Sequence, residues 1–175
     1  VETTRAFGCS MKWKSKMEWK KKLDEDWANK PVKLEEIRLE GLKELLGNRG
    51  EDIMLLNVWA TWCGPCIIEF PEFVDMQRMY GQRHVKMVSL SLDRPTQKEK
   101  ALEFLVEKQA AFTNYIYMDE DKEAFFDLMD PDWQGNIPYT MLVLPGGEVF
   151  YRHDGIIDPL EVRKTIIEQI GRYFA

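Results

Sequence analysis

Two cysteines separated by two residues, Cys63 and Cys66, stand where a predicted strand meets a predicted helix. Residues 52–60 are almost continuously apolar, as in a buried strand, and residues 67–80 carry apolar side chains at helical spacing. Cys63 is therefore expected to open the helix, where unpaired backbone N–H groups and the helix dipole favour a thiolate. Cys66 follows one turn later and can attack the same sulfur. The pattern predicts a redox-active pair in which the Cys63 sulfur is exposed.

The composition limits what the chain can be. With 175 residues, 45% of them hydrophobic, it can bury one core but not two full domains. A net charge of −6 argues against nucleic acid as a partner, because phosphate binding needs a basic face. No apolar run is long enough to predict a transmembrane segment. We expect a monomer with one domain over residues 34–175, preceded by a partly helical extension or linker over residues 1–33.

The extension has its own pattern. Residues 11–22 hold six lysines and one acid, which predicts a solvated helix face or a mobile arm. Between Trp13 and Trp27, apolar residues recur at spacings of three and four, so we expect an amphipathic helix, broken by Pro31. We expect its aromatic stripe to pack on the domain, and binding to a separate partner is the alternative.

The third cysteine, Cys9, follows a small residue and precedes polar ones. This pattern fits the end of a lipoprotein cleavage site, and the alternative is an unremarkable thiol in a flexible segment. The chain begins at Val1 without a methionine, so we expect a processed or trimmed product.

Beyond the cysteine helix, strand and helix patterns alternate. A helix is expected from Thr96 to about Gln109, with Thr96 and Glu99 forming a capping box. Pro145-Gly146-Gly147 is typical of a tight hairpin turn. The other expected elements are helices over 39–46, 119–129 and 158–170 and strands over 84–93, 115–118, 139–144 and 148–153. This order predicts an α/β protein with a central mixed sheet flanked by helices on both faces.

Two segments carry a family resemblance. The first is 56–66 (LNVWATWCGPC), continued by 67–71 (IIEFP), and the second is 135–140 (GNIPYT), ahead of the hairpin. Together they resemble the thioredoxin superfamily, and within it the TlpA/ResA group of extracytoplasmic thiol-disulfide oxidoreductases. The resemblance covers residues 34–174. It implies a thioredoxin-like fold in which the helix and strand over 96–118 are the insertion of that group.

Disulfide exchange needs an attacking thiolate and a resolving thiol, and we expect these to be Cys63 and Cys66. Asn57 stands where thioredoxins carry a buried aspartate, and Glu69 matches the glutamate that the TlpA/ResA group uses instead. An acid near a cysteine can accept its proton when burial raises the proton affinity of the acid. We expect Glu69 to be the base for Cys66, and a surface helix glutamate is the alternative.

The expected substrate-binding residues surround the cysteine pair. The resemblance implies a cis peptide bond before Pro138, which would turn the backbone of Ile137 toward the sulfurs, where it could hydrogen-bond an extended substrate strand. Gly-Pro between the cysteines favours, by the same resemblance, a reductant over a strong oxidant. Trp133 either borders the substrate groove or packs in the core. The substrate-binding set is Trp62, Gly64, Pro65, Ile137 and Pro138.

The expected function is thiol-disulfide exchange, with reduction of protein disulfides as the favoured direction. The expected partners are protein disulfides, apocytochrome cysteines among them, and an upstream thiol electron donor that can be membrane-bound. No cofactor or metal is expected. The expected location is periplasmic or otherwise extracytoplasmic, with a lipid anchor or a longer envelope protein as the two ways of attachment.

The main alternative is a module that holds Cu(I) between the two thiolates. Copper-carrying relatives on this fold usually supply a histidine near the proline loop, where this chain has Asn136 and Ile137. A zinc site would need four ligands. A peroxidase would need a Thr-x-x-Cys setting, and Thr61 stands only two residues before Cys63. A redox-inactive scaffold domain conflicts with the intact cysteine pair.

Overall fold

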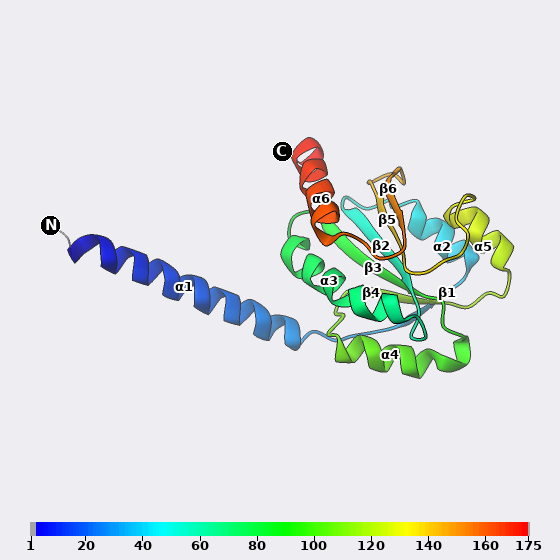
Figure 1. Cartoon of the computed structure of the whole chain (residues 1–175), viewed down its shortest axis with the longest axis horizontal. Coiled ribbons are helices and arrows are strands. Elements are labelled where there is room, and N and C mark those ends of the chain that lie inside the picture. The colour runs from blue at the N-terminus through cyan, green and yellow to red at the C-terminus, as the bar shows by residue number, and fades with distance from the viewer. Residues whose placement is uncertain (1–2, 175) are drawn as a thin grey trace. The chain divides into compact units, whose positions relative to one another are not determined.

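The computed structural model of the protein describes the backbone of residues 3–174 and the side chains of residues 14–174 (Figure 1). The chain divides into two compact units, residues 1–31 and residues 32–175, and each is described by itself. The side chain of Cys9, and with it the expectation of a lipid anchor, lies outside the described residues.

The first unit is one long helix, α1 (Thr3–Ala28), which ends before Pro31. The predicted helix is confirmed, but its predicted amphipathic character is wrong, because apolar side chains are not gathered on one face. Met17 and Trp19 are exposed, whereas Trp27, near the end of the helix, is buried. Among the described residues, Lys16 and Lys20 lie between Met17, Leu23 and Trp27 on the same side of the helix, so that side is not continuously apolar.

The second unit is built on one mixed sheet with the strand order β1-β4-β3-β2-β5-β6. The first four strands run parallel to one another, β5 runs antiparallel to β2, and β6 runs antiparallel to β5. The predicted mixed sheet is confirmed. The strands are β1 (Glu35–Ile37), β2 (Ile53–Trp59), β3 (Val85–Ser91), β4 (Thr113–Tyr117), β5 (Tyr139–Val143) and β6 (Val149–Asp154).

Helices cover both faces of this sheet, as predicted (Figure 1). Several begin at the capping residues that the sequence offers: Asp121 accepts a hydrogen bond from the backbone N–H of Ala124, and Asp158 accepts one from Leu160. The helices are α2 (Leu39–Leu46), α3 (Gly64–Tyr80), α4 (Lys98–Glu107), α5 (Lys122–Met129) and α6 (Pro159–Tyr173).

Strand β2 lies inside the sheet, and all seven of its residues are buried. Because side chains alternate along a strand, its two faces join different cores. Met54 and Val58 pack in a cluster with residues of α2 and α5, whereas Ile53 and Leu55 pack in a cluster with residues of α3 and α6. The same alternation places Asn57 on the α3 side of the sheet.

One local expectation is wrong, and one strand was not expected. The predicted capping box of Thr96 and Glu99 does not form: residues Pro95–Gln97 make a 3₁₀ turn, and α4 begins behind Gln97 without a side-chain cap. Pro95 has the fixed φ that starts such a turn earlier than the capping box requires. Strand β1 was not expected, because its three residues show no strand periodicity, and it forms only through pairing with β4.

The hairpin turn is confirmed. Gly146 and Gly147 have φ angles of 97° and 96°, a left-handed conformation that favours glycine. A Cβ at Gly147 would also come within 3.1 Å of the backbone oxygen of Leu46.

Candidate active site

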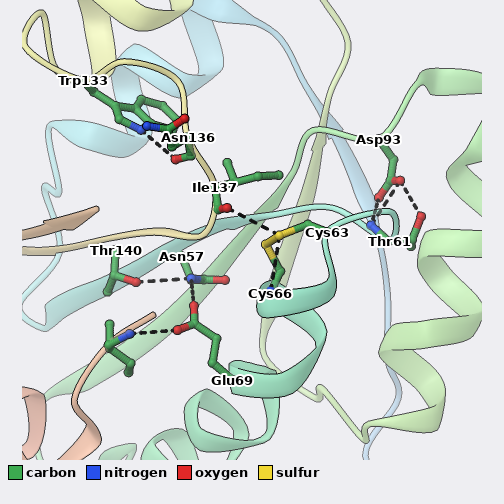
Figure 2. Close-up of a disulfide and its surroundings, with 11 residues drawn as sticks. Asn57, Thr61, Cys63, Cys66, Glu69, Asp93, Trp133, Asn136, Ile137 and Thr140 are labelled. Carbon is green, nitrogen blue, oxygen red and sulfur yellow. Dashed lines mark hydrogen bonds between the residues drawn. A yellow bond between two sulfur atoms is a disulfide. The ribbon is translucent and has the colours of Figure 1, made fainter. Parts of the chain in front are cut away.

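The cysteine pair lies at the junction between β2 and α3 (Figure 2). Cys63 and Cys66 form a disulfide with a Cα–Cα distance of 5.3 Å. Cys63 is the N-cap residue of α3, and its Sγ accepts a hydrogen bond from the backbone N–H of Cys66 at 3.3 Å. Pro65 occupies the first turn, where its missing N–H costs nothing. A Cys63 thiolate would therefore face the unpaired N–H groups at the start of the helix.

The disulfide is covered more than expected. Cys63 is 5% exposed and Cys66 is 1% exposed, whereas Trp62 beside them is 65% exposed. The sequence predicts an exposed Cys63 sulfur, and the structure differs because the loop before β5 lies against it. The carbonyl oxygen of Ile137 lies 3.5 Å from Cys63 Sγ, within reach of a hydrogen bond from the reduced thiol.

That loop contains the cis peptide bond between Ile137 and Pro138 that the resemblance implies. Trp133 does not border an open groove: it is 6% exposed, and its ring stacks on Tyr139 with centroids 4.4 Å apart. Its indole N–H donates to the carbonyl oxygen of Asn136 at 2.8 Å. Trp133 therefore ties the residue before Ile137 to the core.

A polar cluster holds the other end of the loop. The Tyr139 hydroxyl donates to Asp130 Oδ2 at 2.7 Å, and Arg152 Nη1 donates to the Tyr139 hydroxyl at 3.1 Å. The hydrogen bond from Tyr139 lowers the pKa of Asp130, while burial, with the bond to Asp130, raises the pKa of Tyr139 to about 12. The chain on both sides of Pro138 is thus anchored by aromatic packing and hydrogen bonds.

Asp93 is a site residue that the sequence reasoning missed. It is 1% exposed and accepts hydrogen bonds from the backbone N–H and the hydroxyl of Thr61, the latter at 2.6 Å. The Ser91 hydroxyl donates to it at 2.7 Å. The signal was present, because an acid directly after a parallel strand lies at the same sheet edge as the Cys63 loop (Figure 2).

Glu69 lies in α3, one turn after Cys66, and is 3% exposed. The alternative of a surface glutamate is therefore wrong. Its carboxylate accepts hydrogen bonds from Asn57 Nδ2 at 3.2 Å and from the backbone N–H of Ile157 at 3.0 Å. Burial raises the pKa of Glu69 to about 7, against smaller lowering effects of these two hydrogen bonds and of His153. Glu69 can therefore gain or lose a proton near neutral pH.

The described residues offer neither a metal site nor a membrane span. Among these residues, no group of three or more His, Cys, Asp or Glu side chains is arranged to hold a metal ion. Within the same part of the chain, no helix has the length and hydropathy required to span a bilayer.

Known proteins were compared with the chain by sequence and by structure. The thiol-disulfide oxidoreductase ResA of Oceanobacillus iheyensis is 31% identical over 96 residues, which cover 55% of this chain and 46% of ResA. The sporulation thiol-disulfide oxidoreductase A of Bacillus subtilis is 28% identical over 111 residues, which cover 63% of this chain and 64% of that protein. The chain thus spans about half to two thirds of the length of these relatives. Their names give no support to the Cu(I) alternative.

Solved structures with the same fold cover most of the second unit. The crystal structure of a candidate thiol:disulfide interchange protein DsbE from Chlorobium tepidum is 25% identical, with a TM-score of 0.60 over 71% of this chain and 84% of that one. A DsbF homologue from Corynebacterium diphtheriae, 16% identical, has a TM-score of 0.61 over 70% of this chain and 75% of its own. The predicted thioredoxin-like fold is confirmed, and so is the resemblance to ResA. The profile of the AhpC/TSA family matches residues 22–152, and the chain belongs to this thioredoxin-like family.

Proposed function

We propose that the protein is a thiol-disulfide oxidoreductase that reduces disulfides of partner proteins through Cys63 and Cys66. The observation that carries the proposal is the position of the Cys63–Cys66 disulfide at the first turn of α3, with Cys63 as the N-cap. A sulfur at this position is stabilised as a thiolate by backbone N–H groups. In this proposal residues 34–175 carry the activity, and residues 1–33 are an extension.

The proposed reaction has two exchange steps. The Cys63 thiolate attacks one sulfur of a substrate disulfide, so a mixed disulfide forms and the other substrate sulfur leaves as a thiolate. The Cys66 thiol then gives its proton to Glu69, and its thiolate attacks Cys63 Sγ. The Cys63–Cys66 bond forms and the second substrate sulfur leaves, taking the proton from Glu69. The substrate disulfide gains two electrons, which the dithiol loses.

Glu69 suits the role of proton acceptor for Cys66 because it is buried, lies one turn away on the same helix face, and has a pKa raised to about 7. A carboxyl group with an ordinary pKa would be a weaker base for a thiol. Replacing Glu69 with glutamine is expected to slow resolution without unfolding the chain.

The substrate surface in this proposal surrounds the disulfide. Trp62, Gly64 and Pro65 are exposed beside the sulfurs. The backbone of Ile137, which cis-Pro138 turns toward Cys63, can pair with an extended strand of the substrate.

The location that we propose is extracytoplasmic, and the electron source that we propose is an upstream thiol donor. Gly-Pro between the cysteines, which the resemblance associates with reductants, supports the reducing direction. The relatives named as thiol-disulfide oxidoreductases support the same chemistry.

Covalent trapping tests the roles of the two cysteines. All variants carry Cys9→Ser, so that only the site thiols react. After reduction and mixing with insulin, Cys66→Ser is expected to accumulate a mixed disulfide, seen by mass spectrometry under non-reducing conditions. Cys63→Ser is the matched control and should form none. Equal trapping by both variants, or by neither, would contradict the proposal.

A further inference from the structure

The side chain of Asn57 places an unpartnered oxygen in the core. Asn57 is 1% exposed, and its Nδ2 donates to Glu69 Oε1 and to Thr140 Oγ1, each at 3.2 Å. Its Oδ1 is buried and has no hydrogen-bond partner among the described residues. Leaving a buried amide oxygen without a donor is unfavourable, because the oxygen has lost its hydrogen bonds to water. The arrangement is therefore explained best if this oxygen accepts a hydrogen bond in another state of the site.

The cysteine pair is the group of this site that changes state in the proposed reaction. Asn57 faces α3, and on that helix Cys66 lies three residues before Glu69, on the same face. Figure 2 shows the Oδ1 of Asn57 opposite its bonds to Glu69 and Thr140, on the side of the disulfide. In the oxidised form the sulfurs carry no proton to donate. After reduction, Cys66 becomes either a thiol, which is a donor, or a thiolate, which is an acceptor.

Both present partners of Asn57 can reverse their roles. Ionised Glu69 only accepts, whereas protonated Glu69 has an O–H to donate, and the Thr140 hydroxyl can do either. Rotating the carboxamide by about 180° would keep both hydrogen bonds with donor and acceptor exchanged. The same rotation would present Nδ2, in place of Oδ1, to Cys66.

This inference rests on the proposed function. We propose that Asn57 is a positioning residue whose carboxamide reverses as the proton moves from Cys66 to Glu69. With Cys66 a thiol and Glu69 ionised, Oδ1 accepts from the thiol and Nδ2 donates to the carboxylate. With Cys66 a thiolate and Glu69 protonated, Nδ2 donates to the thiolate and Oδ1 accepts from the carboxylic acid. One proton moves, and no electron is exchanged in this step.

Two further titratable groups face Glu69 and must be considered in any pH experiment. His153, on β6, stabilises the carboxylate when charged, and its Nε2 lies 2.8 Å from the oxygen of Ile156. Tyr151, on the same strand, has a pKa raised to about 12 by burial and by nearby carboxylates that include Glu69, so it stays neutral below pH 9. A His153→Gln variant removes the effect of His153 on the Glu69 carboxylate.

Nuclear Overhauser contacts in the reduced protein test the reversal directly. The contact between the Asn57 side-chain amide protons and the Cys66 β protons should be strong where Glu69 is protonated and weak where it is ionised. The change in contact strength and the ionisation of Glu69 should have the same midpoint pH. A midpoint should still be observed in His153→Gln, moved to higher pH, because His153 lowers the pKa of Glu69. In Glu69→Gln, the glutamine Oε1 accepts from Ile157 and its Nε2 donates to Asn57, so the contact should be strong at both pH 5 and pH 9.

Asn114 is the internal control. Its Nδ2 donates to the backbone oxygens of Lys33, Ala110 and Phe112, and its Oδ1 accepts from Ser89. This carboxamide is locked, so its contacts should not depend on pH. Equal Asn57 contacts at pH 5 and pH 9 would overturn the proposal, and because this measurement uses the wild-type chain it does not depend on whether a variant folds.

A kinetic measurement reports the consequence for Cys66. In a chain with Cys9→Ser and Cys63→Ser, Cys66 is the remaining thiol, and its alkylation rate follows its thiolate fraction. Asn57→Leu should lower that rate about tenfold at pH 7, because it removes the hydrogen bond that Nδ2 donates to the thiolate. An unchanged rate would contradict the proposal. Successful trapping by Cys66→Ser together with pH-independent Asn57 contacts would refute this inference alone, and leave the proposed function standing.

Discussion

Burial of Glu69 predicts an unusual dependence of stability on pH. Its pKa is raised from 4.5 to about 7 in the folded chain, mainly by desolvation. At Glu69 the folded state therefore binds more protons than the unfolded state between these values, so the contribution of Glu69 to stability is greatest below pH 4.5 and falls as the pH rises toward 7. Above about pH 7 both states are ionised and the loss is complete.

The magnitude follows from the two pKa values. Between pH 5 and pH 8, the raised pKa of Glu69 should cost the folded oxidised protein about 2.5 kcal/mol. Glu69→Gln removes this titration and keeps an acceptor for the backbone N–H of Ile157. The free energy of unfolding of Glu69→Gln, relative to wild type, should therefore rise by about 2.5 kcal/mol from pH 5 to pH 8.

Urea unfolding of both proteins at the two pH values measures this difference. Glu72→Gln is the matched control, because it removes a carboxylate from the same helix, where Glu72 and Arg163 form a partly exposed ion pair at 2.9 Å. Its effect should change with pH by less than about 1 kcal/mol. If the free energies of unfolding of wild type and Glu69→Gln change by the same amount from pH 5 to pH 8, burial does not raise the pKa of Glu69 as described.

Three further substitutions test the supports of the site, each by urea unfolding of the oxidised protein. Thr61→Val removes a hydroxyl donor to buried Asp93 and should cost about 1–3 kcal/mol; no loss would mean that this bond adds nothing. Tyr139→Phe removes the donor to Asp130 and should cost about 1 kcal/mol, and a stabilised variant would contradict the role of that cluster. Phe70→Ala removes a fully buried ring that packs against Trp59 and Phe104 and should cost about 3–5 kcal/mol, so a change below 1 kcal/mol would refute the packing described.

The sequence predicted those parts of the fold that depend on local patterns. The helix over 39–46, the central strand and the glycine turn of the hairpin each carry a strong signal within a few residues. Strand β1 carries no such signal, because its three residues become a strand only through β4, about 80 positions later. At α1, apolar residues at spacings of three and four predicted an amphipathic helix, but over the whole helix they do not form a continuous apolar face.

The same distinction between local signals and contacts distant in sequence applies to the candidate site. The cysteine pair and cis-Pro138 could be predicted, because short motifs carry them. The burial of Glu69 could not, since its second hydrogen bond comes from Ile157, 88 positions away in the chain. The cover over Cys63 was missed for a similar reason: a strand-to-helix junction is exposed in isolation, and the loop that closes over it is distant in sequence.

The bonds between Asp93 and Thr61 have a consequence for how the fold can diversify. Asp93 stands at the end of β3, just before the segment with α4, and it already ties that strand to the loop in front of Cys63. Insertions or deletions after Asp93 would thus lie downstream of the hydrogen bonds that hold the loop before Cys63 in place. Related chains could lengthen or rebuild this region, and so reshape what approaches the disulfide, without disturbing the placement of the cysteines.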